Sequence, residues 1–160
     1  AGAYPVEVVK TMALIAETTE KNIDYKKRFS NRRTEINRNV ADAIAHATVT
    51  TAHDLNASAI ITVSKGGQTA RLISKYRSEC PIIGCTTSDV VCRQMNMSWG
   101  VIPFVIDEKT NTDDLFASAV YAAESRALVE DGDLVVITAG VPLGVSGTTN
   151  LMKVEKIGNH

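Results

Sequence analysis

The feature that most constrains the fold is an alternation of short apolar runs with amphipathic segments. Four runs of five or six residues, rich in β-branched side chains, predict strands at Ala59–Val63, Ile82–Thr86, Val101–Ile106 and Asp133–Thr138. Helical patterns lie between them, near Thr69–Tyr76, Ser88–Met95 and Asp113–Val129. Strands that alternate with helices pair in parallel through right-handed crossovers. The sequence therefore predicts an open parallel sheet with helices on both faces.

The connection to the last apolar run, Leu151–Ile157, differs from the others. It spans about a dozen residues, AGVPLGVSGTTN, which show no helical period and are too few for a crossover helix. The last strand is therefore expected to pair antiparallel to its neighbour and to lie at an edge. The predicted fold class is α/β, a three-layer open sheet of about five strands, four parallel and a final antiparallel edge strand.

Charge and hydropathy exclude several classes of partner. The 160 residues carry a net charge of −1, which offers no electrostatic basis for binding nucleic acid or an anionic membrane. No apolar run approaches the roughly 20 residues of a membrane span, and no signal-peptide pattern opens the chain. Three cysteines, an odd number, suit a reducing compartment. We expect a cytoplasmic protein with neither nucleic acid nor membrane as partner.

Cysteine and histidine side chains do not form a recognisable reactive or metal site. Cys80, Cys85 and Cys92 lack metal-ligand spacing, and Cys85 is expected to be a core residue rather than a catalytic thiol. His46 and His53 lie seven residues apart on the polar face of a predicted helix. We expect both to be solvated, with a zinc site as the less favoured alternative.

The N-terminal part of the chain contains two helices and a basic segment. The apolar pattern of residues 5–21 predicts a helix that begins at Pro5, a residue suited to the first helical position. Residues 25–33 are basic and show no sustained period, so we interpret them as a linker, with nucleic-acid contact as the weaker alternative. A long helix is expected from about Thr34 to Leu55.

Two glycine-rich loops carry the strongest functional signal. SKGGQT leaves the first strand and AGVPLGVSGTTN leaves the fourth; in a doubly wound sheet these strands flank the reversal of strand order, where ligands bind. Glycines, a helix N-terminus, one lysine and several hydroxyls suit a phosphate. The alternative is an ordinary turn with a solvated lysine. The candidate phosphate- or effector-binding residues are Ser64, Lys65, Gly66, Gly67, Gln68, Thr69, Gly140, Gly144, Ser146, Gly147, Thr148 and Thr149.

Catalytic groups do not accompany these loops. No obvious base, nucleophile or metal-binding carboxylate cluster lies beside them in sequence, and the chain has no G-x-x-x-x-G-K-[ST] match. The predicted site can therefore hold a phosphate without reacting with it.

Several segments resemble pyruvate kinase. The opening AGAYPVEVVKTMALIAETTE resembles the last barrel helix of that family. AIITVSKGGQTARLISKYRSECPIIGCT, SWGVIPFV and DGDLVVITAGVPLGVSGTTNLMKV resemble its C-terminal domain, and the tail GTTNLMKV is similar to bacterial forms. The resemblance implies a remnant helix of the (β/α)8 barrel over residues 1–24, a linker over residues 25–33 and a C-terminal regulatory α/β domain over residues 34–160.

The resemblance also implies a parent reaction. Pyruvate kinase transfers phosphate from phosphoenolpyruvate to ADP in glycolysis, with Mg²⁺ and usually K⁺. In the family the catalytic lysine, arginine and metal-binding carboxylates lie on the barrel, so no catalytic or metal-binding residue is carried over. We expect this chain to be catalytically inert and to hold no cofactor.

The C-terminal domain of the family binds a phosphorylated allosteric effector. The family's first phosphate loop corresponds to Ser64–Thr69 and its effector-covering loop to Gly140–Thr149. Animal forms regulated by fructose 1,6-bisphosphate carry arginines where Gln68 and Phe116 stand, and a tryptophan near Lys109–Asp113. The departures favour a monophosphate such as AMP or ribose 5-phosphate over fructose 1,6-bisphosphate.

Two classes of function remain open at this point. One is an effector-binding and subunit-assembly domain of pyruvate kinase; the other is a free-standing nucleotide- or phosphosugar-binding module outside any enzyme. The N-terminal helix and basic segment favour the first. The family assembles through its C-terminal domains, so we expect a homodimer through the edge strand Leu151–Ile157, unless Lys153, Glu155 and Lys156 only protect that edge.

Overall fold

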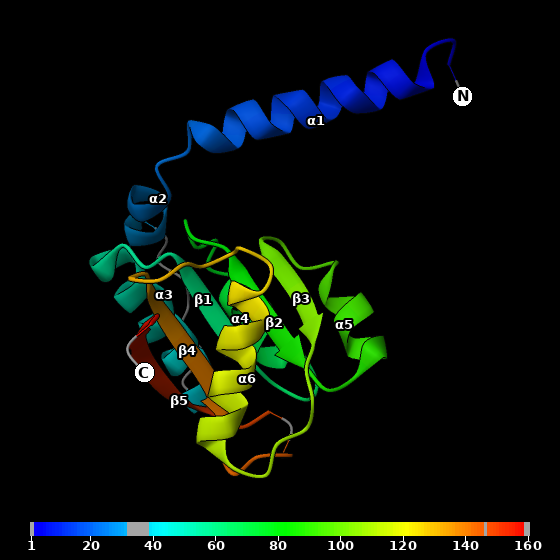
Figure 1. Ribbon diagram of the computed structural model, residues 1–160. Coiled ribbons are helices and arrows are strands. Elements are labelled where there is room, and N and C mark those ends of the chain that lie inside the picture. The colour runs from blue at the N-terminus through cyan, green and yellow to red at the C-terminus, as the bar shows by residue number, and fades with distance from the viewer. Residues whose placement is uncertain (1, 32–38, 146, 159–160) are drawn as a thin grey trace.

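The computed structural model describes residues 2–31, 39–145 and 147–158, which include a single open sheet of five strands (Figure 1). Its strands are β1 (Ala59–Val63), β2 (Ile82–Thr86), β3 (Val101–Val105), β4 (Leu134–Gly140) and β5 (Thr149–Lys156). The order is β3-β2-β1-β4-β5, with β1 to β4 parallel and β5 antiparallel to β4. The predicted fold class is confirmed, including the antiparallel strand at the edge.

Helices cover both faces of the sheet. Helices α3 (Val40–Leu55), α4 (Gln68–Ser74) and α5 (Asp89–Met95) contribute to the packing of one face, and α6 (Thr112–Glu124) packs on the other. The cap residues Asn39, Ser88 and Asn111 each accept a backbone N–H of the first turn. Helix α6 ends at Glu124 rather than near Val129, because the chain reverses at Ala127, whose φ is +53°.

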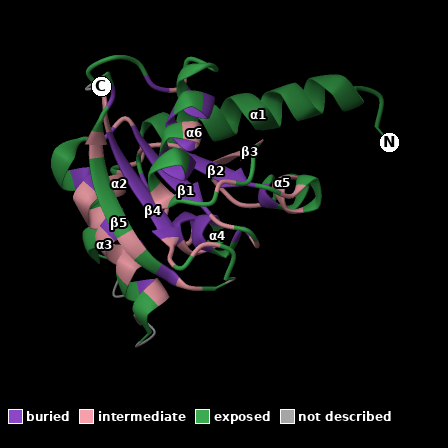
Figure 2. Ribbon diagram, turned by 60° about the horizontal axis from the view of Figure 1, so that its bottom comes forward, coloured by how far each residue is buried: buried purple, intermediate pink, exposed green. Residues whose placement is uncertain are grey.

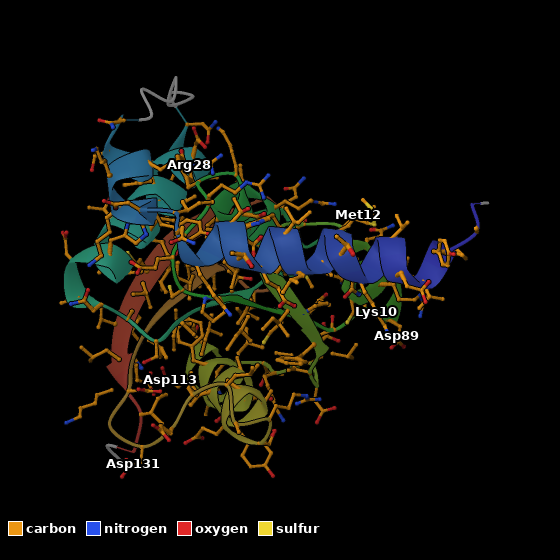
Figure 3. All side chains as sticks on the ribbon, turned by 90° about the horizontal axis from the view of Figure 1, so that it is seen from above. Lys10, Met12, Arg28, Asp89, Asp113 and Asp131 are labelled. Atoms are coloured by element: carbon orange, nitrogen blue, oxygen red, sulfur yellow. The ribbon has the colours of Figure 1, made fainter. Side chains whose placement is uncertain are left out.

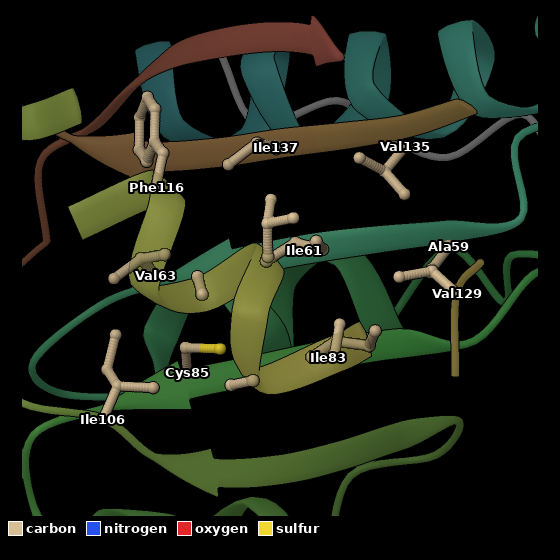
Figure 4. Close-up of a cluster of buried hydrophobic side chains, with 14 of the residues drawn as sticks. Ala59, Ile61, Val63, Ile83, Cys85, Ile106, Phe116, Val129, Val135 and Ile137 are labelled. Atoms are coloured by element: carbon tan, nitrogen blue, oxygen red, sulfur yellow. The ribbon is translucent and has the colours of Figure 1, made fainter. Parts of the chain in front are cut away.

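The α6-side cluster is the apolar core between α6 and the sheet (Figure 4). Ile61, Ile83 and Ile137 have no exposed surface, and Phe116 of α6 is 4% exposed. Cys85 lies in the same cluster and is 1% exposed, which confirms the prediction of a core residue. Burial raises the pKa of the Cys85 thiol to about 12, so this sulfur stays protonated at neutral pH.

The α3-side cluster occupies the opposite face and includes apolar residues of α3, α4, β1, β2 and β4. Ala45, Val49 and Ile73 of the two helices have no exposed surface. In Figure 2 the buried residues follow the central strands, whereas β5 is mostly intermediate or exposed. The central strands are covered on both faces, as continuous apolar runs in a parallel sheet require.

Helix α1 (Pro5–Lys21) matches the predicted span and begins at Pro5. None of its residues is buried, and the helix extends away from the sheet (Figure 1). Figure 3 shows the side chains of Lys10 and Met12 standing out from this helix. Residues 32–38, which include the expected start of the next helix at Thr34, lie outside the described residues; α3 is described from Val40.

The basic segment predicted as a linker contains a helix, α2 (Tyr25–Asn31). Phe29 packs against the α3-side cluster, Tyr25 contacts the ring of Trp99 with centroids 5.7 Å apart, and Lys26 donates to Asn56 Oδ1. The segment interpreted as a linker thus includes a short helix, which its lack of a sustained period did not indicate, because Phe29 and Tyr25 hold it through contacts distant in sequence. The division into domains stays a prediction.

The prediction that both histidines are solvated was wrong for His53, which is buried, whereas His46 is half-buried. The ring of Phe29 stacks on His46 with centroids 5.1 Å apart and meets His53 edge-on at 5.2 Å. His53 is 8% exposed, and its Nε2 accepts the backbone N–H of Glu79 at 3.3 Å. Burial lowers the pKa of His53 below the usual 6.5. The polar helical face is covered by α2, which the sequence pattern did not reveal.

Candidate functional site

A cavity of about 280 Å³ lies beyond the carboxyl ends of the parallel strands. Segments that follow β1, β2, β3 and β4 all contribute to its wall. From β1 the chain runs to β2 and β3 on one side, whereas β4 lies on the other side of β1. As the sequence predicts, β1 and β4 flank the reversal of strand order, which is where open α/β sheets bind ligands.

The β1–α4 loop (residues 64–67) brings polar groups to the cavity. Among the described residues, no acceptor takes the backbone N–H groups of Gly66, Gln68 and Thr69. Ser64 Oγ is buried and has no hydrogen-bond partner in the described part of the chain. Lys65 is exposed and lines the cavity. Unpaired N–H groups, a hydroxyl and an ammonium group together suit an oxyanion.

Gly67 has a geometric role in this loop. It is the N-cap of α4 with φ +68°, a conformation that L-residues with side chains rarely adopt. A Cβ at this position would lie 3.0 Å from Val91 Cγ1 and from Met95 Cγ. Gly67 therefore lets α4 begin close against α5, and it does not line the cavity.

The β4–β5 loop (residues 141–148) forms the opposite wall. Its base is tight, because a Cβ on Gly140 would lie 2.6 Å from Thr148 Oγ1. Thr149 Oγ1, at the start of β5, lies 2.6 Å from Thr69 Oγ1 on α4, and both threonines are buried. This hydrogen bond connects the two glycine-rich segments directly. The hydroxyls of Thr69 and Thr149 thus have partners already, although an oxygen can make more than one hydrogen bond.

The structure places most of the predicted site residues around one cavity. Ser146 lies outside the described residues, and Gly67 faces α5. The predicted residues that line the cavity are Ser64, Lys65, Gly66, Gln68, Thr69, Gly140, Gly144, Gly147, Thr148 and Thr149. The geometry brings the two loops together as expected, whereas ligand binding at these residues stays a prediction.

Sequence reasoning missed the third side of the cavity. This side comes from the segments that follow β2 and β3 and from the first turns of α6: Thr86, Thr87, Glu108, Lys109, Thr110 and Leu115. These residues have no glycine-rich pattern, so only their position after parallel strands could have indicated them. Lys109 adds a second cationic side chain and Glu108 a carboxylate, so the wall carries both signs of charge.

Two hydroxyl groups at the cavity support its loops. Thr86 Oγ1 donates to the carbonyl oxygen of Lys65 at 3.2 Å, and Thr148 Oγ1 donates to that of Val145 at 3.0 Å, so these hydroxyls support the loops. Within residues 2–31, 39–145 and 147–158, no three His, Cys, Asp or Glu side chains are placed to hold a metal ion. Among the same residues no helix has both the length and the apolar character needed to cross a membrane.

A five-stranded open sheet with helices on both faces and a cavity at its strand reversal defines the class of open α/β domains. Comparison with known proteins defines the family. Residues 42–155 match the family described as pyruvate kinase, alpha/beta domain. The chain therefore belongs to the pyruvate kinase family, as the C-terminal domain of that enzyme.

Individual relatives agree with this assignment. The chain is similar to the pyruvate kinase of Clostridium acetobutylicum, with 47% identity over 156 residues, 98% of this chain and 33% of the relative. It is similar to that of Staphylococcus aureus, with 44% identity over 160 residues, 100% of this chain and 27% of the relative. The chain spans a third or less of the length of these curated relatives.

Solved structures give the same result. A pyruvate kinase of Cryptosporidium parvum in complex with ADP aligns with a TM-score of 0.81 and 34% identity, over 97% of this chain and 31% of that one. A second structure of a pyruvate kinase from this organism aligns with a TM-score of 0.84 at the same identity and coverage. The resemblance inferred from the sequence is confirmed.

Proposed function

We propose that the cavity binds a phosphorylated small-molecule effector and that this domain regulates a pyruvate kinase. The observation that carries the proposal is the meeting of the β1–α4 and β4–β5 loops around one cavity, joined by the Thr69–Thr149 hydrogen bond. The unpaired N–H groups and the buried Ser64 hydroxyl supply donors, and Lys65 supplies charge. Membership of the family favours a domain of an enzyme over a free-standing binding module.

A single phosphate group fits the charges of the wall best. Lys65 and Lys109 are the two cationic side chains among the described lining residues, and Glu108 opposes them. Gln68 is uncharged, and Phe116 is buried in the α6-side cluster and does not line the cavity. These features support AMP or ribose 5-phosphate over fructose 1,6-bisphosphate, because two lysines and one carboxylate leave a single net positive charge on the wall, too little to balance two phosphates.

The parent reaction is the second part of the proposal. The curated relatives are pyruvate kinases about three or more times as long as this chain. We infer that the parent is a cytoplasmic glycolytic phosphotransferase that converts phosphoenolpyruvate and ADP to pyruvate and ATP with Mg²⁺ and K⁺. The 160-residue chain should form no ATP from these substrates. Turnover that copurifies with the chain through repeated chromatography would contradict this.

Assembly is the third part. Strand β5 lies at the edge of the sheet, and Met152 and Val154 are 36% and 42% exposed on the same face of it. On the other face, Lys153 Nζ forms an ion pair with Glu155 Oε2 at 2.7 Å. We infer a two-fold contact through β5 and the neighbouring α3. Sedimentation should show a dimer; a monomer at about 100 μM, which means less than roughly 6 kcal/mol of association, would contradict it.

Calorimetric titration tests the ligand site. Lys65→Ala should weaken binding of AMP or ribose 5-phosphate by about 1.5–3 kcal/mol, the usual scale for a hydrogen bond to a charged group. Lys10→Ala is the matched control, because Lys10 is exposed on α1, far from the cavity residues in sequence. Equal affinity in the wild-type and Lys65→Ala chains would remove Lys65 from the site.

A further inference from the structure

The pairing of β4 with β5 changes register beside the cavity. From Leu134↔Lys156 to Ala139↔Leu151 the two strands pair regularly, but Gly140 faces Thr149 instead of Asn150. Asn150 is thus an extra residue on β5, a β-bulge. Bulges interrupt the ladder locally and redirect neighbouring side chains, and they are frequent next to functional sites.

The side-chain amide of Asn150 hydrogen-bonds the backbone of Val141, the first residue after β4. Its Oδ1 accepts the backbone N–H of Val141 at 2.9 Å, and its Nδ2 donates to the carbonyl oxygen of Val141 at 2.7 Å. One amide group therefore satisfies both polar backbone groups of the first loop residue. The base of the β4–β5 loop is therefore held by the Asn150 side chain in addition to the last pair of the ladder, Gly140 and Thr149.

The same register change brings Thr149 opposite Gly140 and within reach of α4. Thr149 Oγ1 contacts Thr69 Oγ1 at 2.6 Å, and the two residues are 3% and 2% exposed. A buried hydroxyl pair is costly to separate, because each oxygen would lose a partner without gaining water. Thr69 belongs to the first turn of α4, which carries the unpaired N–H groups of the other wall.

We propose that Asn150 is a positioning residue that fixes the β4–β5 loop over the cavity, and that the Thr69–Thr149 hydrogen bond couples this loop to the first turn of α4. The inference rests on the proposed function for its effect on binding, whereas the coupling itself is a property of the chain. A loop that is fixed before the ligand arrives loses less conformational entropy on binding. Removing the Asn150 amide should therefore weaken ligand binding without unfolding the sheet.

Residue-resolved amide exchange by NMR tests the coupling in the wild-type chain and in Asn150→Ala. The variant should exchange faster at Val141, which loses its acceptor, and at Arg71, whose N–H bonds to Gly67 O at 3.2 Å in the first turn of α4. Amides of β1 and β2 should keep their rates. Asn96→Ala is the matched control, since the Asn96 amide contacts only carbonyls of α5. An unchanged rate at Arg71 would overturn the coupling.

Two further variants separate the parts of this arrangement. Asn150→Asp keeps an acceptor for the N–H of Val141 but loses the donor, so its exchange rates should lie between those of wild type and Asn150→Ala. Thr149→Val should speed exchange at Arg71 and leave Val141 protected. Loss of protection at both residues in Thr149→Val would contradict separate roles for the amide and the hydroxyl pair.

Titration with inorganic phosphate and with AMP tests the effect on binding. Asn150→Ala should bind about tenfold more weakly, the loss expected from one net hydrogen bond, with a melting temperature close to that of Asn96→Ala. Faster exchange with unchanged affinity would overturn the positioning role. A wild-type chain that binds neither compound would instead contradict the proposed function, and the exchange rates alone would then decide the coupling.

Discussion

The two faces of the sheet are packed with different chemistry. Under α6 the cluster consists of apolar side chains, including the thiol of Cys85. On the other face, buried polar groups accompany the apolar ones: Asp42, Thr48 and His53 on α3 and Ser74 on α4. Apolar packing is insensitive to pH, whereas buried ionisable groups link stability to protonation. The face under α6 is therefore stabilised by apolar packing alone, whereas the face under α3 and α4 also depends on polar contacts.

The largest expected loss of stability comes from a substitution on the apolar face, in the α6-side cluster. Phe116→Ala removes a ring that is 4% exposed and leaves a cavity in the α6-side cluster. The free energy of unfolding should fall by about 3–5 kcal/mol, the range for truncating a buried Phe. Urea denaturation measures it. Tyr121→Ala is the control on the same helix, because Tyr121 is 71% exposed; equal losses in the two variants would contradict the assignment of the core.

The second largest loss of stability is expected on the polar face, the side of the sheet that α3 and α4 cover. The Asp42 carboxylate is fully buried, accepts the Tyr76 hydroxyl at 3.0 Å and pairs with Lys75 Nζ at 3.3 Å. Asp42→Ala removes this acceptor from both groups, so the free energy of unfolding should fall by about 1.5–3 kcal/mol. Tyr76→Phe, which removes only the hydroxyl, should cost less. An Asp42→Ala chain as stable as wild type would show that the buried carboxylate contributes nothing.

Phe29 tests whether the polar face extends to α2. Its ring contacts His46, His53 and Tyr76, the last with centroids 6.0 Å apart. Phe29→Ala should lower stability by about 1–2 kcal/mol, the scale of one or two aromatic pairs, and expose α2 to protease. Phe29→Leu keeps an apolar contact and should lie between the two. Unchanged proteolysis at residues 25–31 would mean that the ring does not hold α2.

The smallest effect is a pH dependence that only the polar face should show. Burial lowers the pKa of His53, with Lys26 acting in the same direction and Glu79 and Asp54 against it. The folded state therefore binds fewer protons than the unfolded state just below 6.5, the pKa of an unperturbed histidine. The contribution of His53 is complete above that pH and is lost as pH falls through 6.5 towards its lower folded pKa.

Denaturation at a series of pH values from 7.5 to about 5 measures this dependence. His53→Gln keeps a neutral acceptor for the N–H of Glu79 and should give a flatter profile than wild type. The Phe116→Ala chain is the control, because its loss of stability relative to wild type should be the same at each pH. A wild-type profile that matches His53→Gln would contradict the assignment.

Much of the fold could be predicted because its signals are local. Apolar runs such as Ala59–Val63 and the proline at the start of α1 determine an element within a few residues. The short connection before β5 settles the direction of that strand. Helix α2 was missed because its support comes from His46 on α3 and from Tyr76, just after α4, which are distant in sequence.

The candidate site, like the fold, was predicted only where the sequence carries a local pattern. The glycine-rich loops are visible as patterns, and strand order brings them together. Glu108, Lys109 and Thr86 carry no pattern of their own and reach the cavity only through the parallel pairing of β2 and β3 with β1. The bulge at Asn150 depends on the register between two strands, which single-residue preferences do not determine.

The exposure of α1 has a thermodynamic consequence. This helix has 17 residues and none of them is buried, so no packing against the sheet stabilises it in this chain. A peptide helix of that length is in rapid exchange with coil, and its helical fraction falls gradually on heating. Calorimetry of the chain would therefore record one sharp transition from the α/β body, while circular dichroism would lose helical signal over a wide range of temperature before it.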